Sequence, residues 1–194
     1  IFSWNRPLAE RWARYENAEI GGTGWDIEKK LPKEIDEIKP HINYGFSSRG
    51  CIRNCPFCCV REKEGYFHIV GDIYDIWDGK SDFVHLFDNN ILADKDHFRK
   101  ICEQLIKENL KVDFGQGLDI RLVDDDVAKW LSKLKFHKQL RFAWDLMEYE
   151  DVFTRNIKKV LKYIHPHKIM VYVLVGYNTT FEEDMYRVKK IWGM

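Results

Sequence analysis

Three cysteines lie within eight residues of one another, and their spacing suggests a specific chemistry. Cys51, Cys55 and Cys58 occur in the run Cys-Ile-Arg-Asn-Cys-Pro-Phe-Cys, a C-x3-C-x2-C spacing with an aromatic residue before the last thiol. A structural zinc site closes with four protein ligands, whereas iron–sulfur clusters are held by cysteine thiolates. Three thiolates on a four-iron cluster would leave one iron open to a small molecule. The spacing therefore predicts a cluster that can take part in catalysis.

Two other side chains are candidates for a fourth ligand. Cys59 directly follows Cys58, and adjacent side chains of an extended chain point to opposite sides. His68 lies ten residues beyond Cys58 and has no second ligand beside it. A non-catalytic module that binds zinc or an iron–sulfur cluster is the alternative hypothesis, and a ferredoxin-type carrier would also need a fourth cysteine. Cys102 lies in a helical pattern and is predicted to be a small buried hydrophobe.

The composition bounds the class of protein. The chain has 194 residues, of which 45% are hydrophobic and 14% aromatic, enough apolar material for a packed core. Lys plus Arg and Asp plus Glu number 31 each, so a net charge of zero gives no support for a nucleic-acid partner. The sequence contains no apolar run of about 18 residues, so it predicts no membrane span. Five cysteines, an odd number, do not form a disulfide framework and favour the reducing cytoplasm.

From residue 41 onward, apolar strands alternate with amphipathic helices. Strands are predicted over 42–47, 82–88, 112–115, 140–144 and 169–175, and helices over 95–109, 127–134, 152–164 and 181–192. This order predicts an α/β fold with a parallel sheet and about five β/α units. Ligands gather at the carboxyl ends of parallel strands, and the cysteine run follows the first predicted strand.

The cysteine run, with Gly50 before it, resembles the cluster loop of the radical S-adenosylmethionine (SAM) superfamily. The resemblance implies a partial (β/α) barrel of parallel strands and a [4Fe–4S] cluster on Cys51, Cys55 and Cys58. Its remaining iron would chelate the amino and carboxylate groups of SAM. Reduction by an external donor of flavodoxin or ferredoxin type would then cleave SAM to methionine and a 5′-deoxyadenosyl radical, which abstracts hydrogen from a substrate that the sequence does not identify.

The same resemblance assigns cofactor-binding roles to the loops after the strands. The residues assigned to SAM binding are Phe57, Asp88, Asn89, Asn90, Asp119, Arg121, Asp145 and Gly176. Residues 88–90 occupy the position at which the superfamily binds the SAM amino group, although the glycines usual in the superfamily are absent here. The alternative is that these residues form an Asx turn that closes the strand. Arg121 could bind the SAM carboxylate, or could pair with Asp119.

The remaining assignments concern the nucleoside part of SAM. Asp145, after the fourth predicted strand, could bind the ribose hydroxyls. Gly176 matches an apolar-x-Gly element of the superfamily that passes the adenine, and Phe57 would flank the same ring. Arg49, Arg53 and Arg61 surround the cysteines, and their positive charge would favour the reduced cluster.

The first forty residues differ from the rest and are predicted to be an N-terminal extension. Residues 41–194 are predicted to form the barrel, which would lack its last strand. Within the extension we predict a strand end over 1–4, a helix over 6–15, a short strand at 19–20 and a helical linker over 32–38. The pattern is similar to the tail of the Rossmann-like, cobalamin-binding-type domain that precedes some radical SAM barrels, although no cobalamin-ligating histidine motif is present.

Overall fold

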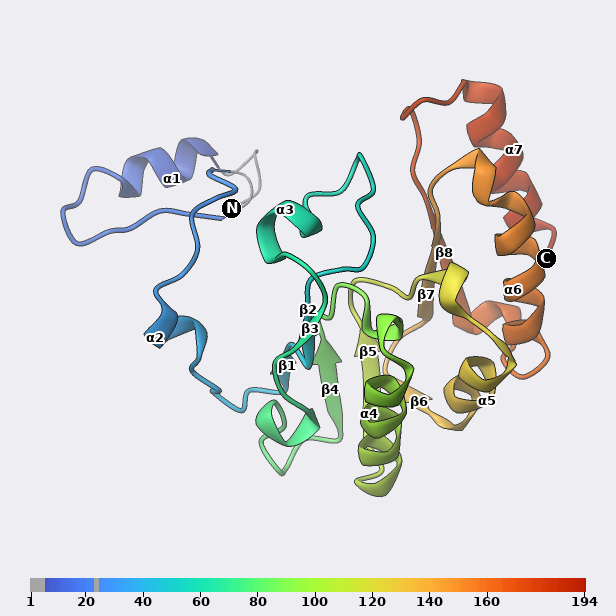
Figure 1. The fold of residues 1–194 in the computed structure, drawn as a ribbon, viewed down its shortest axis with the longest axis horizontal. Helices are drawn as coiled ribbons and strands as arrows, with labels where there is room; N and C mark the ends of the chain where they lie inside the picture. Colours follow the sequence, from blue (N-terminus) through green and yellow to red (C-terminus); the bar gives the residue numbers. More distant parts are fainter. Residues whose placement is uncertain (1–5, 23–24) are drawn as a thin grey trace.

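The computed structural model describes residues 6–22 and 25–194, whose path is drawn in Figure 1. The helices are α1 (Arg6–Trp12), α2 (Lys33–Asp36), α3 (Val60–Glu64), α4 (Lys95–Lys107), α5 (Asp125–Lys133), α6 (Glu150–Leu161) and α7 (Phe181–Trp192). The strands are β1 (Tyr44–Gly45), β2 (Ser48–Arg49), β3 (His68–Ile69), β4 (Phe83–Leu86), β5 (Lys111–Phe114), β6 (Lys135–Phe136), β7 (Leu140–Trp144) and β8 (Ile169–Val173). Within the described part of the chain, no helix is long and apolar enough to cross a membrane.

The strands that form the body of the molecule pair in parallel. β1, β4, β5 and β6 form one sheet in that order, and β7 pairs with β8. A parallel bridge between Leu118 and Phe142 connects the two sheets, and the Leu118 amide donates to the Arg141 carbonyl at 2.8 Å. Helices α4, α5 and α6 pack against one another beside the strands (Figure 1). The prediction of an α/β fold with a parallel sheet is confirmed.

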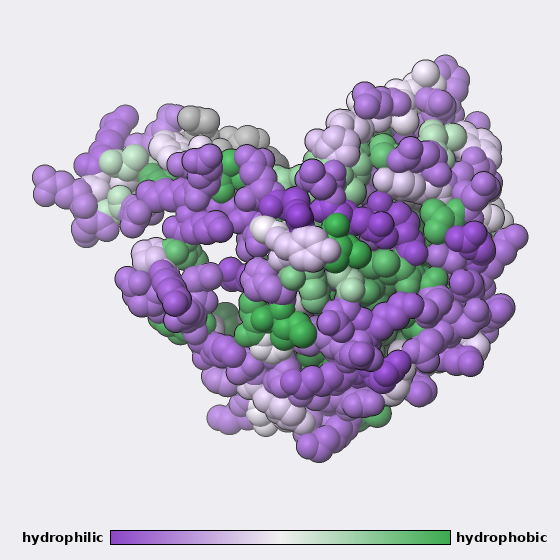
Figure 2. All heavy atoms as spheres, in the orientation of Figure 1, coloured by the Kyte–Doolittle hydropathy of each residue, from purple (hydrophilic) through white to green (hydrophobic). Residues whose placement is uncertain are grey.

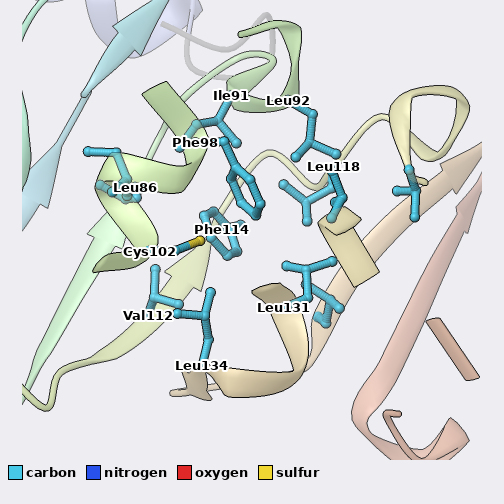
Figure 3. Close-up of a cluster of buried hydrophobic side chains, with 14 of the residues drawn as sticks. Leu86, Ile91, Leu92, Phe98, Cys102, Val112, Phe114, Leu118, Leu131 and Leu134 are labelled. Atoms are coloured by element: carbon cyan, nitrogen blue, oxygen red, sulfur yellow. The ribbon is translucent and has the colours of Figure 1, made fainter. Parts of the chain in front are cut away.

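The hydrophobic core lies between the parallel strands and these helices. Val84 and Leu86 alternate along β4 with less buried residues, so one face of the strand packs against the helices. Figure 3 shows Phe98 and Cys102 of α4 directed toward Phe114 of β5. Burial raises the pKa of the Cys102 thiol well above its ordinary value, and the side chain is fully enclosed. The prediction that Cys102 is a buried hydrophobe is confirmed.

Short polar side chains start the helices where the sequence indicates. Asp124 precedes α5, and its carboxylate accepts from the Val127 amide at 2.8 Å. Thr180 precedes α7 and forms a capping box with Glu183, in which each side chain accepts from the other residue's amide. These caps satisfy amides that have no partner within the helix. Glu183 is thereby used in capping, as its position three residues after Thr180 predicts.

The first strand differs from its prediction. The range 42–47 was expected to be one strand, but β1 covers only Tyr44–Gly45, and the chain then forms β2, which pairs antiparallel with β3. The cause is a buried carboxylate: Asp88 accepts from the amides of Ser47 and Ser48 at 3.1 and 2.6 Å and so turns the chain away from β4. The β2–β3 pair and β6 have no counterpart among the predicted elements.

The other boundaries shift by a few residues. The ranges 140–144 and 181–192 coincide with β7 and α7, while the strand predicted over 169–175 ends at Val173. In the extension, the helix predicted over 6–15 ends at Trp12 and the helical linker shortens to α2. No strand forms at 19–20. The strand end predicted over 1–4 lies outside the described residues.

Candidate functional site

The cysteine loop leaves the sheet in a direction fixed by hydrogen bonds. Besides the two amides, the Asp88 carboxylate accepts from the hydroxyls of Ser47 and Ser48, each at 2.6 Å. His97 of α4 contacts the Ser47 hydroxyl at 2.9 Å through Nε2. Four donors on one buried carboxylate make this a satisfied polar network, which holds the chain just before the first cysteine.

The turn into the loop requires glycine. Gly50 has a φ of 74°, and a Cβ at this position would lie 2.3 Å from the Tyr66 carbonyl oxygen. The Gly50 amide donates to Asn89 Oδ1 at 2.9 Å, and the Cys51 amide donates to the Gly65 carbonyl at 3.3 Å. The loop is therefore bonded on one side to the residues after β4 and on the other to the end of α3.

The three cysteines face a common pocket of about 210 Å³. Its lining is contributed by the cysteine loop and the start of α3, by the segments that follow β4 and β5, and by the end of β7 with the segment after it. The lining residues are Cys51, Arg53, Cys55, Phe57, Cys58, Val60, Arg61, Asn89, Asn90, Gln116, Gly117, Leu118, Asp119, Ile120, Arg121, Ala143, Asp145 and Tyr149. Six of the eight predicted SAM-binding residues are therefore brought together with the three predicted cluster ligands.

One wall of the pocket, called here the β4–β5 wall, consists of Asn90, Asp119 and Arg121. Asn90 Nδ2 lies 3.4 Å from both Cys51 Sγ and Asp119 Oδ2, and donates to each. The Arg53 amide also donates to Cys51 Sγ, at 3.3 Å. Asn90 Oδ1 is buried and has no hydrogen-bond partner within the described chain. Donors directed at a sulfur stabilise its thiolate form.

The charged groups of this wall form a tight cluster. Arg121 donates from Nε and Nη2 to the two Asp119 oxygens at 2.7 and 3.0 Å, and Arg53 Nε donates to Asp119 Oδ2 at 3.2 Å. Burial raises the pKa of Asp119, but the hydrogen bonds and charge of the arginines outweigh it and lower that pKa below its ordinary value. The Arg121 guanidinium also lies 4.7 Å above the Tyr149 ring. The predicted alternative of an Asp–Arg pair is thus present inside the pocket.

A second wall, called here the β7 wall, consists of Ala143, Asp145 and Tyr149. Burial raises the pKa of Asp145, and the charges of Arg121 and Arg187 only partly oppose that shift. The Asp145 carboxylate makes no hydrogen bond with the described residues. Tyr149 was not predicted, because it comes from a short 3-10 turn, Met147–Tyr149, that has no periodic signal.

Two predicted residues lie outside the pocket lining. Asp88 is directed at Ser47 and Ser48 rather than at the pocket. Gly176 has a φ of 71°, and its amide donates to Asp184 Oδ2 at 2.9 Å. The structure therefore gives Asp88 a role in holding the loop, since its carboxylate accepts four hydrogen bonds from Ser47 and Ser48.

The arrangement of the thiols fits a cluster better than a single metal ion. No group of three or more His, Cys, Asp or Glu side chains in residues 6–22 and 25–194 is arranged to hold a single metal ion. Ligands of a four-iron cluster bind different irons and so stand further apart than ligands of one ion. Burial, and then the neighbouring cysteines, raise the pKa of Cys58, so iron would displace a proton there. The neighbouring arginines and amide donors fit an anionic cluster.

Neither candidate for a fourth ligand lines the pocket. Cys59 is exposed, and its backbone begins α3. His68 is exposed in β3, where Nδ1 lies 2.9 Å from the Tyr66 carbonyl oxygen. The pocket thus offers three thiols and several polar side chains, without a fourth Cys or a His in its lining.

Comparison of the chain with family models, with curated proteins and with solved structures found no match. The chemistry of the pocket is therefore inferred from its own residues.

Proposed function

We propose that the protein is a radical SAM enzyme. The observation that carries this proposal is the set of three thiols, Cys51, Cys55 and Cys58, that face one pocket without a fourth Cys or His in its lining. These thiols would hold a [4Fe–4S] cluster with one iron left open, and the chemistry that such a cluster would supply is the binding and reductive cleavage of SAM. An external electron donor of flavodoxin or ferredoxin type supplies the electron.

The polar residues of the pocket suit the groups of SAM. Asn90 Oδ1, which is buried without a partner, accepts a hydrogen bond from an ammonium. Arg53 and Arg121 supply positive charge for a carboxylate, although both already bind Asp119. Asp145, whose carboxylate is free, binds ribose hydroxyls.

The aromatic contribution comes from the cysteine loop itself. Phe57 lines the pocket, and its ring meets the Tyr177 ring edge-on with centroids 5.4 Å apart. Tyr177 follows Gly176, so this contact brings the segment after β8 to the cysteine loop. In the proposed complex the adenine of SAM would bind against Phe57 on the pocket side.

We also propose that β1, β4, β5, β7 and β8 are five strands of a partial (β/α) barrel. The support is their parallel pairing in chain order, with the bridge between Leu118 and Phe142 joining the two sheets. The segments that follow β4, β5 and β7 all contribute to the pocket, as expected of the carboxyl ends of barrel strands. A reduced cluster of this kind suits the cytoplasm.

The proposal is tested by anaerobic reconstitution with iron and sulfide, followed by EPR of the dithionite-reduced protein with and without SAM. We expect a [4Fe–4S]+ signal that changes when SAM is added. A signal that SAM leaves unchanged would contradict the proposal. Stoichiometric zinc without a reducible cluster would instead support the alternative of a structural metal module.

A further inference from the structure

Two hydrogen-bond donors directed at the sulfur of Cys51 differ in kind. The Arg53 amide belongs to the cysteine loop itself and donates to Cys51 Sγ at 3.3 Å. Asn90 Nδ2 donates to the same sulfur at 3.4 Å, from the segment that follows β4. The backbone donor does not depend on the identity of a side chain, whereas the second donor requires an asparagine. A substitution at Asn90 can therefore remove a donor without altering the backbone of the cysteine loop.

Asp119 holds the Asn90 amide in this direction. Asn90 Nδ2 also donates to Asp119 Oδ2 at 3.4 Å, and because an NH₂ group carries two hydrogens, both bonds form together. Asp119 is itself fixed by Arg53 and Arg121, whose Nε atoms donate to its oxygens at 3.2 and 2.7 Å. Asn90 Oδ1 has no hydrogen-bond partner in the described part of the chain. The two acceptors thus orient the amide with its NH₂ group toward the sulfur.

The bonds of Asn90 are shielded from water. Asn90 is 3% exposed, and the Asp119 side chain is 8% exposed. A larger hollow of about 1470 Å³ lies between the N-terminal extension and the strands, where Figure 2 shows the surface hollowed, and Cys51, Cys55 and Cys58 do not line it. A hydrogen bond in a low-dielectric environment is electrostatically stronger than one in water. The Asn90 donor therefore acts more strongly on the sulfur than an exposed donor would.

Such a donor affects the redox balance of a cluster. The reduction potential of an iron–sulfur cluster depends on its net charge, on the hydrogen bonds to its sulfurs and on its exposure to solvent. A reduced cluster carries one more negative charge than the oxidised cluster, and part of that charge lies on the thiolate sulfurs. A donor at a thiolate sulfur therefore stabilises the reduced form more than the oxidised form.

We propose that Asn90 is a positioning residue that raises the reduction potential of the cluster through its hydrogen bond to Cys51. Asp119 directs the Asn90 amide at the sulfur. The electron comes from the external donor, and Asn90 exchanges neither a proton nor a bond when the cluster is reduced. This inference rests on the proposed function only in placing a [4Fe–4S] cluster on the three cysteines, and it does not require SAM.

The test is an EPR-monitored redox titration of the reconstituted full chain without SAM, so that no contact between Asn90 and SAM enters the result. Asn90→Leu keeps nearly the same side-chain volume and removes the donor. It should lower the reduction potential by about 59 mV, which corresponds to a tenfold loss in the equilibrium constant for one-electron reduction. Asn90→Ala removes the donor without crowding the pocket and should lower the potential as well. Gln116→Leu is the matched control, because it removes another amide side chain from the same pocket lining and should leave the potential unchanged.

The outcomes separate this inference from the proposed function. An unchanged potential in both Asn90 variants would overturn the inference, and so would an equal shift in Gln116→Leu. Loss of the cluster from both Asn90 variants would also overturn it, because Asn90 would then be needed for assembly of the cluster. A lowered potential in the Asn90 variants, with a wild-type EPR signal that SAM leaves unchanged, would support the inference and contradict the proposed function. A SAM-responsive cluster whose potential does not depend on Asn90 would do the reverse, and a wild-type chain without a reducible cluster would overturn both.

Discussion

The two walls of the cysteine pocket differ in how fully their polar groups are satisfied. In the β4–β5 wall, Asp119 accepts from Arg53, Asn90 and Arg121, and its pKa is lowered. In the β7 wall, the Asp145 carboxylate makes no hydrogen bond with the described residues, and burial raises its pKa. The comparison teaches that one wall is assembled by its own hydrogen bonds, whereas the other keeps a carboxylate available for a ligand.

The buried side chains that hold the backbone behind the two walls also differ in the sign of their charge. An anion, Asp88, collects amides and hydroxyls beneath the cysteine loop. A cation, Arg187, donates to the carbonyls of Trp144, Asp145 and Leu174 at 2.9, 2.5 and 2.7 Å, and pairs with Asp184. An incoming loop presents amides, while strands that end present carbonyls, so each support carries the charge that its chain segment requires.

The largest expected effect comes from the three cysteines that line the pocket together with both walls. Replacing Cys51, Cys55 or Cys58 by Ala should lower bound iron after reconstitution by more than about tenfold, because in the proposed cluster each thiolate would ligate a different iron. Iron and sulfide analysis measures this. Cys59→Ala is the matched control and should retain the cluster; its loss in that variant would disprove the assignment of three ligands.

Removal of the cation behind the β7 wall should have the next largest effect. Arg187→Met leaves three carbonyls and Asp184 buried without their donor, and should cost about 3–5 kcal/mol in the free energy of unfolding. Urea denaturation measures the change. Arg155→Met, on the exposed side of α6, should stay within about 0.5 kcal/mol of the wild type. Similar losses in both variants would show that Arg187 holds no strand ends.

Replacing the Asp88 carboxylate beneath the cysteine loop should lower the unfolding free energy less than Arg187→Met does, but should reduce iron incorporation more. Asp88→Asn replaces one acceptor oxygen by a donor facing Ser47 and Ser48, and should cost about 1–3 kcal/mol in unfolding free energy. It should also lower iron incorporation, because the loop before Cys51 loses its fixed direction. Unchanged iron incorporation in a measurably destabilised Asp88→Asn variant would show that Asp88 does not fix the direction of the cysteine loop.

The smallest effects distinguish the walls by their pH dependence. The lowered pKa of Asp119 contributes stability above the unfolded value of about 3.9, and that contribution is lost as pH falls through the folded pKa. The raised pKa of Asp145 costs stability at neutral pH, and that cost disappears on acidification. Asp119→Asn should therefore destabilise at pH 7, and Asp145→Asn should stabilise by less than about 1 kcal/mol. Denaturation at pH 7 and pH 4 measures both, and shifts of the same sign would contradict the comparison.

Much of the fold follows from the sequence because its signals are local. The periodicity over 140–144 and 181–192 predicts β7 and α7 to the residue, and Asp124 and Thr180 start their helices as expected. The β2–β3 pair was missed because it depends on Asp88, some forty residues away in the sequence, which no local pattern reveals.

The candidate site was predictable to a similar extent. Spacing identified the cysteines, and position after each strand identified Asn90, Asp119, Arg121 and Asp145 as residues that could meet in one pocket. Position alone could not show that the Asp88 side chain is directed at Ser47 and Ser48, whereas the next two residues, Asn89 and Asn90, line the pocket. The buried ion pair of Asp113 and Arg141 was missed because the two residues come from separate strands, β5 and β7, and meet only in the folded sheet.

The most direct test of the central claim is electron–nuclear double resonance of the reduced cluster with SAM labelled by ¹⁵N in the amino group or ¹⁷O in the carboxylate. The three-thiolate pocket predicts hyperfine coupling from both labels to the cluster, because the open iron would bind these two groups directly. A reduced [4Fe–4S]+ cluster that shows no coupling to either label in the presence of excess SAM would contradict the account.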